Sequence, residues 1–177
     1  MDDDKQPAIA PTWSVAGYYF CNLLDTFDAL GGDSDRLLEK ACPGRASRYE
    51  RERHYPLAQL LRLYRLAADE CQEPDLGLHC VMQDAVDAFG LLGAIAKSAG
   101  TLREAWESIL RYRQLMMNLG RSRIVDEAGL VSLSWYPYSH DIVTERYFVD
   151  AVVAAWIIRS SALADTDISP VEVRLTY

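Results

Sequence analysis

The hydrophobic pattern of this chain changes period near residue 120, and this change constrains the fold more than any other feature. Before Gly120, apolar residues recur at spacings of three and four, as on the buried face of an α-helix. After it, the segment "RSRIVDEAGLVSLSWYPY" alternates apolar and polar residues around a turn at residues 127–129, as two β-strands do. A helical half followed by strands predicts an α+β protein.

The first half contains helical segments with recognisable ends. We expect helices over residues 15–30, 34–41 and 56–71, followed by a short helix within "EPDLGLHCVMQ". Each of the first three begins at a residue whose side chain or ring suits a helix N-terminus. Those residues are Ser14, Asp33 and Pro56.

The segment "DAFGLLGAIAKSAGTLREAWESILRYRQLMM" predicts two further helices. The first, over residues 87–98, is apolar almost all round, so we expect it to be buried. Gly90 and Gly93 each cost a helix about 1 kcal/mol relative to Ala, and close approach to a neighbouring helix would compensate. The second, over residues 101–117, opens with a T-x-x-E capping box.

The second half has the order strand–strand–helix–strand. We expect a long helix over about residues 143–163, and the terminal "VEVRLTY" (171–177) alternates like a strand. That strand needs a partner, either the hairpin or another copy of the chain. The predicted fold class is therefore α+β: an N-terminal helical bundle (14–119) followed by a small antiparallel sheet with a long packed helix (120–177).

Length and charge limit the class of protein. The 177 residues are enough for one domain with a core of its own. The start "MDDDK" resembles a cleavable tag, so residues 1–13 are taken as a tag-like, extended lead-in and residues 14–177 as the domain. The formal net charge is −8, or −6 without those three Asp and one Lys, which disfavours binding to DNA or anionic lipid. No apolar run reaches the ~18 residues of a membrane span, so no membrane partner is expected.

Reactive and metal-binding residue types form no clear constellation. The four cysteines contain no C-x-x-C pair and are interpreted as reduced thiols in a cytoplasmic protein. A zinc site through Cys71, His79 and Cys80 is an alternative, but no fourth ligand stands out. His140 beside Asp141 could form an acid–base pair, although its place between a strand and a helix favours a loop role. We expect no catalytic residues, metal or cofactor.

Two groups of residues could form a binding site. Asp150 lies in an apolar helix and needs a partner; Arg146 could provide a surface pair, or Asp150 could face a pocket or interface. Aromatic residues also flank the junction between residues 101–117 and the hairpin. Core packing explains most of them, but a small-molecule pocket uses the same types with a few polar groups, such as Arg111 for an organic acid. The candidate ligand-binding residues are Trp106, Arg111, Tyr112, Trp135 and Tyr138.

The order of these segments resembles one known family. The segment "PLAQLLRLYRLAADECQEPDLGL" precedes "FGLLGAIAKSAGTLREAWESILRY", and a hairpin and a long helix follow. This order is similar to the N-terminal effector domain of AraC/XylS-type bacterial transcription regulators, in the arabinose-binding variant. The usual Ser-Pro before the threonine is Ala99-Gly100 here, a departure that affects only the turn. The matching residues are Pro56, Leu57, Leu60 and Leu63; Pro74, Asp75, Gly77 and Leu78; and Gly90, Leu92, Gly93, Thr101, Leu102, Glu104 and Ala105.

The resemblance implies a cytoplasmic domain that senses a small-molecule effector, forms a homodimer and has no catalytic residues. DNA would be a partner only through a C-terminal pair of helix-turn-helix units, which this sequence lacks. The family name does not establish arabinose as the effector, and we expect an organic acid or an amphiphile. The alternative is a structural dimerisation module without a small-molecule ligand.

Overall fold

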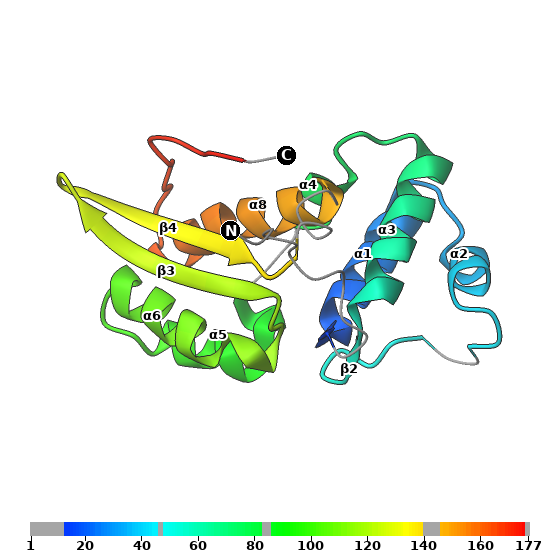
Figure 1. Ribbon diagram of the computed structural model, residues 1–177, viewed down its shortest axis with the longest axis horizontal. Coiled ribbons are helices and arrows are strands. Elements are labelled where there is room, and N and C mark those ends of the chain that lie inside the picture. The colour runs from blue at the N-terminus through cyan, green and yellow to red at the C-terminus, as the bar shows by residue number, and fades with distance from the viewer. Residues whose placement is uncertain (1–12, 46–47, 83–85, 140–145, 176–177) are drawn as a thin grey trace, which may run out of the picture.

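The computed structural model describes residues 13–45, 48–82, 86–139 and 146–175. Helices and two small antiparallel sheets make up this part of the chain, so the α+β class is confirmed. The elements form two lobes, with α4 (Leu76–His79) and α8 (Arg146–Ala164) between them (Figure 1). The helical lobe is α1, α2 and α3; the hairpin lobe is α5, α6, β3 and β4.

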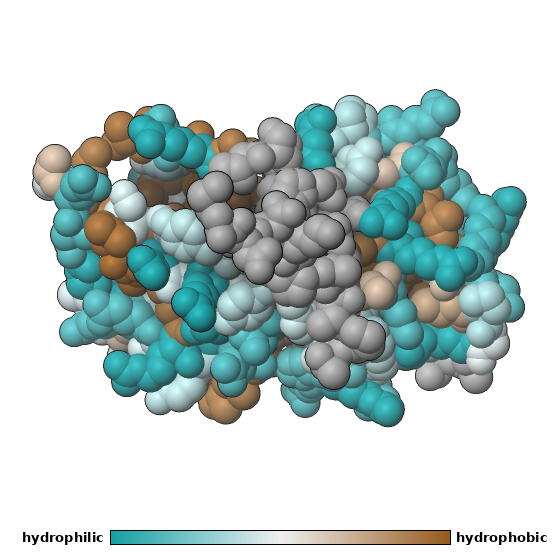
Figure 2. Space-filling view, viewed as in Figure 1, coloured by the Kyte–Doolittle hydropathy of each residue, from teal (hydrophilic) through white to brown (hydrophobic). Residues whose placement is uncertain are grey.

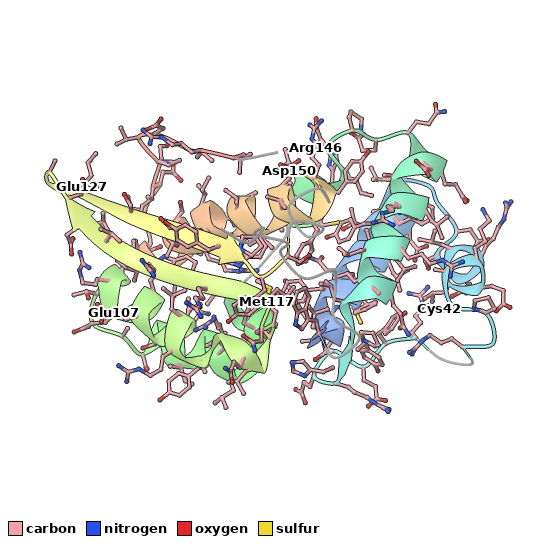
Figure 3. All side chains as sticks on the ribbon, in the orientation of Figure 1. Cys42, Glu107, Met117, Glu127, Arg146 and Asp150 are labelled. Carbon is pink, nitrogen blue, oxygen red and sulfur yellow. The ribbon has the colours of Figure 1, made fainter. Side chains whose placement is uncertain are left out.

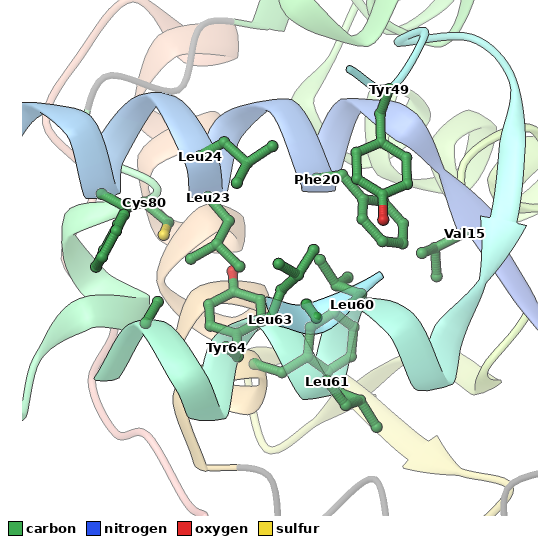
Figure 4. Close-up of a cluster of buried hydrophobic side chains, with 14 of the residues drawn as sticks. Val15, Phe20, Leu23, Leu24, Tyr49, Leu60, Leu61, Leu63, Tyr64 and Cys80 are labelled. Carbon is green, nitrogen blue, oxygen red and sulfur yellow. The ribbon is translucent and has the colours of Figure 1, made fainter. Parts of the chain in front are cut away.

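The helical lobe follows the predicted periodicity closely. Its helices are α1 (Gly17–Ala29), α2 (Ser34–Ala41) and α3 (Leu57–Cys71), each within two residues of the expected bounds. The predicted cap of α2 is confirmed, because the Asp33 carboxylate accepts a hydrogen bond from the Arg36 backbone N–H at 3.0 Å. Apolar side chains of α1 and α3 meet in a common core (Figure 4), and those fully buried on α1 are Phe20, Leu23, Leu24 and Phe27.

A short sheet that the sequence pattern did not predict precedes two of these helices. Strand β1 (Ser14–Ala16) pairs antiparallel with β2 (His54–Pro56). The predicted role of Ser14 as a helix cap is therefore wrong, and α1 begins after Ala16 without a side-chain cap. The Ala16 N–H also donates to the Met116 carbonyl at 2.7 Å, which ties β1 to the hairpin lobe.

The helix expected over residues 87–98 has a different start. Residues Val86–Phe89 form a 3₁₀ turn, and α5 (Gly90–Lys97) follows it directly. Its first residue, Gly90, has a φ of +53°, a conformation that glycine tolerates without strain. The expected all-round burial is also wrong, because Leu91 is 68 % exposed. The expected close approach to a neighbouring helix is wrong: a Cβ atom at Gly93 would overlap the Val86 carbonyl oxygen of this turn, and a Cβ atom at Gly90 would meet nothing within 4 Å.

Helix α6 (Leu102–Tyr112) begins at the predicted capping box. The Glu104 N–H donates to Thr101 Oγ1 at 3.2 Å, and Glu104 Oε2 accepts from the Gly100 N–H at 3.0 Å. The helix ends earlier than expected, because Arg113–Leu115 form a 3₁₀ turn. The chain then enters the hairpin.

The predicted hairpin is confirmed, but the predicted third strand is wrong. Strands β3 (Gly120–Glu127) and β4 (Leu130–Pro137) pair antiparallel, with Glu127 and Leu130 flanking the turn. In the described part of the chain this sheet has two strands. Residues 171–175 follow α8 without forming a strand, and the last two residues of the predicted strand lie outside the described range.

Helix α8 confirms the expected long helix from Arg146 onward; residues 143–145 lie outside the described range. By length and composition it is apolar enough to cross a membrane. In this fold it is packed between the two lobes, and Phe148, Val152 and Ala155 are buried. A core helix of a globular domain has the same composition.

A candidate ligand cavity between the lobes

The larger of two neighbouring cavities lies where α1, α6, the hairpin and α8 meet. Its volume is about 540 Å³, including space that is open to solvent. Small-molecule sites in proteins are typically mostly apolar clefts with a few polar groups. The lining residues are Tyr19, Phe89, Leu92, Trp106, Ile109, Leu110, Arg113, Met116, Met117, Leu119, Gly120, Ser122, Trp135, Val152, Trp156 and Arg159.

The smaller cavity, of about 400 Å³, adjoins the larger one and extends toward α3 and α4. The two share five lining residues, so they form neighbouring compartments on either side of the same wall. Figure 3 shows one of these residues, Met117, between the two lobes. The shared residues are Tyr19, Met117, Val152, Trp156 and Arg159.

Tryptophan side chains hold α6 and α8 together along the cavity. The Trp106 Nε1–H donates to Ser160 Oγ at 2.9 Å, and its ring meets Trp156 edge-on at a centroid distance of 6.0 Å. Trp135 of β4 meets Phe148 of α8 in the same manner at 6.4 Å. These contacts give the cavity fixed aromatic walls, since a buried indole N–H with a partner has one preferred orientation.

Two arginines bring positive charge to this apolar lining. The Arg159 guanidinium lies 3.6 Å from the centre of the Phe89 ring, and the residue is only 8 % exposed. Arg113 Nη1 donates to the Leu110 carbonyl at 2.7 Å. Its Nε is buried and makes no hydrogen bond within the described residues. None of the lining residues that the structure describes for the larger cavity is Asp or Glu.

The structure brings together some of the candidate ligand-binding residues and separates others. Trp106 and Trp135 both line the larger cavity. Arg111 and Tyr112 are exposed and lie outside the lining of either cavity, and Tyr138 packs its ring against Trp13 at 6.2 Å.

Arg113, and not the predicted Arg111, is the arginine of this segment that lines the cavity. It lies four residues after Ile109 and seven after Trp106, so helix periodicity alone puts it on the same face as these two residues. The contributions of α1 and α8, such as Tyr19 and Trp156, have no comparable local signal because they come from distant segments.

Asp150 forms the predicted pair with Arg146, but it is not a solvent-facing residue. The Arg146 Nε lies 3.3 Å from Asp150 Oδ2, and the Asp150 side chain is only 10 % exposed (Figure 3). Arg146 Nη2 also lies 3.9 Å from Asp75, at the start of α4. Asp150 lines neither cavity; it pairs with Arg146, which in turn joins α8 to α4 through Asp75.

The residues that could have bound zinc are engaged in other ways. Burial raises the pKa of the Cys80 thiol to about 11, which keeps it protonated at neutral pH. His79 Nε2 lies 3.7 Å from the Glu73 carboxylate. Within the ranges that the structure describes, no three His, Cys, Asp or Glu side chains are grouped to hold a metal. His140 and Asp141 lie outside those ranges.

Comparison with known proteins agrees with this architecture. A search of curated proteins finds no match. The family model for the arabinose-binding domain of AraC transcription regulators, N-terminal, matches residues 31–177. This range runs from just before α2 to the end of the chain, and it includes every lining residue of the larger cavity except Tyr19. The chain therefore belongs to the family of arabinose-binding N-terminal domains of AraC transcription regulators.

Proposed function

We propose that this domain senses a small-molecule effector in the cavity between its lobes. Membership of a family of ligand-binding regulatory domains supports a sensing function. The observation that carries the proposal is the origin of the lining: Tyr19 comes from the helical lobe, Trp106 and Trp135 from the hairpin lobe, and Trp156 from α8. A ligand that contacts both lobes and α8 would favour one arrangement of the lobes. The free energy of this preference is the coupling free energy of a sensor.

In this proposal the DNA-binding units belong to a part of the regulator outside this sequence, and the regulator acts in the cytoplasm. The formal charge of −8 supports this division, because an acidic surface repels the phosphate backbone. We expect no specific binding of duplex DNA by this chain alone at physiological salt, as measured by gel shift. A specific complex formed by the isolated chain would contradict the division.

Catalysis is not part of the proposal. The family is one of regulator domains, and the described residues that line the larger cavity include no Asp, Glu, His or Cys side chain for acid–base or nucleophilic steps. Arabinose is also a poor match to this lining. A sugar needs hydrogen-bonding partners around its ring, whereas the polar side chains of the lining are few: Tyr19, Arg113, Ser122 and Arg159, besides the indole N–H groups.

A homodimer is the second element of the proposed function. Large apolar side chains of β3 and β4 are exposed, including Val131 at 63 % and Tyr136 at 56 %. In Figure 2, hydrophobic atoms reach the surface at the hairpin end of the molecule. Exposed apolar side chains on a two-stranded sheet favour association with a second copy. A structural dimerisation module without a ligand would show this surface too, so a ligand test must separate the two functions.

Thermal unfolding with a panel of small metabolites is that test. A ligand at about 100 times its dissociation constant should add about 2.7 kcal/mol to the free energy of unfolding. It should also change the fluorescence of the cavity tryptophans. Ile109→Trp, which narrows the cavity, should abolish both effects, and Tyr112→Trp on the exposed face of the same helix should keep them. A ligand whose effect survives Ile109→Trp would contradict the cavity as the site, and no effect across a broad panel would favour the structural module.

A further inference from the structure

We propose that the effector is a small, mainly apolar carboxylate whose charged group is bound by Arg113. This inference rests on the proposed sensing function and specifies the chemistry of the ligand. Among the described residues, the larger cavity is lined by aromatic and aliphatic side chains together with two arginines and no carboxylate, in a protein whose formal net charge is −8. Its lining is therefore opposite in sign to the charge of the molecule as a whole.

Arg113 provides the binding group because one of its donors is buried without an acceptor. Its Nη1 is held by the Leu110 carbonyl at 2.7 Å, which fixes the side chain at the end of α6. Its Nε is buried and has no hydrogen-bond partner within the described residues. A buried donor without an acceptor costs stability, and a carboxylate oxygen from a ligand would remove that cost. A guanidinium also matches a carboxylate in shape better than any other side chain does.

Arg159 adds a second positive charge to the same cavity. Its guanidinium is held over Phe89 and is only 8 % exposed. Arg159 has further interactions of its own, so the proposal assigns the contact with the ligand to Arg113. The charge of Arg159 still favours an anion, because charges act over a longer range where water is largely excluded.

The remaining lining defines the body of the ligand. Trp106, Trp135 and Trp156 contribute flat apolar faces, and Met116 and Leu119 add flexible or aliphatic surface. Such walls fit a single aromatic ring or a short alkyl chain better than a polyhydroxylated molecule. The expected class is therefore a monocarboxylate with an aromatic or short aliphatic body.

Matched acid and amide pairs test the inference on the intact chain. The probes are 4-phenylbutyrate with 4-phenylbutanamide, and octanoate with octanamide, titrated by tryptophan fluorescence and calorimetry at neutral pH. Each acid should bind at least about tenfold more tightly than its amide, as expected for a hydrogen bond to a charged group. Arg113→Met should reduce this ratio at least about threefold, leaving the smaller preference due to the charge of Arg159, while the affinity for the amides stays within about twofold. Arg111→Met, two residues earlier and exposed, is the control and should keep the ratio.

The outcomes separate this inference from the proposed function. Equal affinities of wild-type protein for acid and amide, with binding lost in Ile109→Trp, would overturn the carboxylate inference and leave cavity sensing intact. If the acid and its amide still bind to Ile109→Trp, the cavity is not the binding site, and the proposed sensing function is overturned as well. If neither acid binds, the inference is overturned.

A second variant is available if Arg113→Met does not fold. Arg113→Lys keeps the positive charge but loses Nε, so it should reduce the ratio of acid affinity to amide affinity. An unchanged ratio would contradict the role of Arg113.

Discussion

Asp28, near the end of α1, fixes the start of α2 through its carboxylate. It accepts hydrogen bonds from the Ser34 backbone N–H at 2.9 Å and the Ser34 hydroxyl at 2.8 Å, and Arg48 Nη2 lies 3.4 Å away. Burial alone would raise the pKa of Asp28, but these hydrogen bonds outweigh it and hold the pKa below the ordinary value for aspartate. The ionised form therefore stabilises the folded state.

Asp28→Asn should lower the free energy of unfolding by about 1 kcal/mol at pH 7, the usual contribution of such a hydrogen bond at a partly exposed site. The contribution of the Asp28 charge is fully present above the unfolded pKa of about 3.9 and is lost as the pH falls through the lower folded pKa. The difference in free energy of unfolding between wild type and variant should therefore shrink below about pH 4.

Urea unfolding of both proteins from pH 7 to 2.5 measures this difference. Asp35→Asn, at a side chain that is 82 % exposed, is the control. A difference that stays constant with pH would refute this account.

At the scale of elements, local signals predicted most helices and the hairpin. The Asp33 cap, the T-x-x-E capping box and the alternation on both sides of residues 127–129 each act within a few residues. Strands β1 and β2 were missed because each has three residues and they pair across about 40 positions of sequence. The expected strand over residues 171–177 had β-branched alternation but has no partner strand in the described residues, and strand propensity depends on such partners.

The candidate cavity was predictable only in part for the same reason. Trp106 and Trp135 were found because large aromatic residues flanked a junction between predicted elements. Arg111 was preferred to Arg113, although the helical phase from Ile109 favours Arg113. The wall formed by α8, including Trp156 and Arg159, depends on how α8 packs between the lobes, which no local pattern in the sequence specifies.

Gly93→Ala should destabilise the protein, although alanine favours helix formation. The added Cβ would overlap the Val86 carbonyl oxygen, so the 3₁₀ turn must move away from α5. Such overpacking costs about 1–3 kcal/mol, which exceeds the gain of up to about 1 kcal/mol in helix propensity. Thermal unfolding measures the change. Gly100→Ala is the matched control, because its Cβ would meet only the flexible Glu104 carboxylate at 3.2 Å. An equal effect of the two substitutions would show that close packing at Gly93 is not the cause.

At the scale of the molecule, α8 and α4 form the connection between the lobes. A Cβ on Gly77 of α4 would overlap the Tyr147 carbonyl of α8, so the two backbones are in direct contact. Arg146 of α8 adds an ion pair to Asp75 across the same contact, and it also pairs with Asp150 within α8. Because α8 also lines the cavity, a ligand that shifts α8 by a small amount would move the connection between lobes. In the proposed sensor, this contact would carry the effect of a bound effector to the relative position of the hairpin.

The exposed hairpin is the surface where that change would reach a second copy of the chain. Leu130 and Val131 are 53 % and 63 % exposed near its turn, and in the described residues β3 and β4 pair only with each other. Apolar side chains beside unpaired backbone groups are unfavourable in water, and a second copy would cover both. The proposed dimer therefore has the hairpin at its contact.

Val131→Asp should convert this dimer to a monomer. The new carboxylates of two copies would face each other in a contact that excludes water, where like charges repel strongly and cannot be solvated. Light scattering across a concentration series should give dimer mass for wild type and monomer mass for the variant at the same concentrations. Leu91→Asp is the matched control, because Leu91 is 68 % exposed on α5 and carries the same change away from the hairpin. A wild-type protein that is monomeric at every concentration would refute the dimer. If only Leu91→Asp abolishes the dimer, its interface lies at α5 and not at the hairpin.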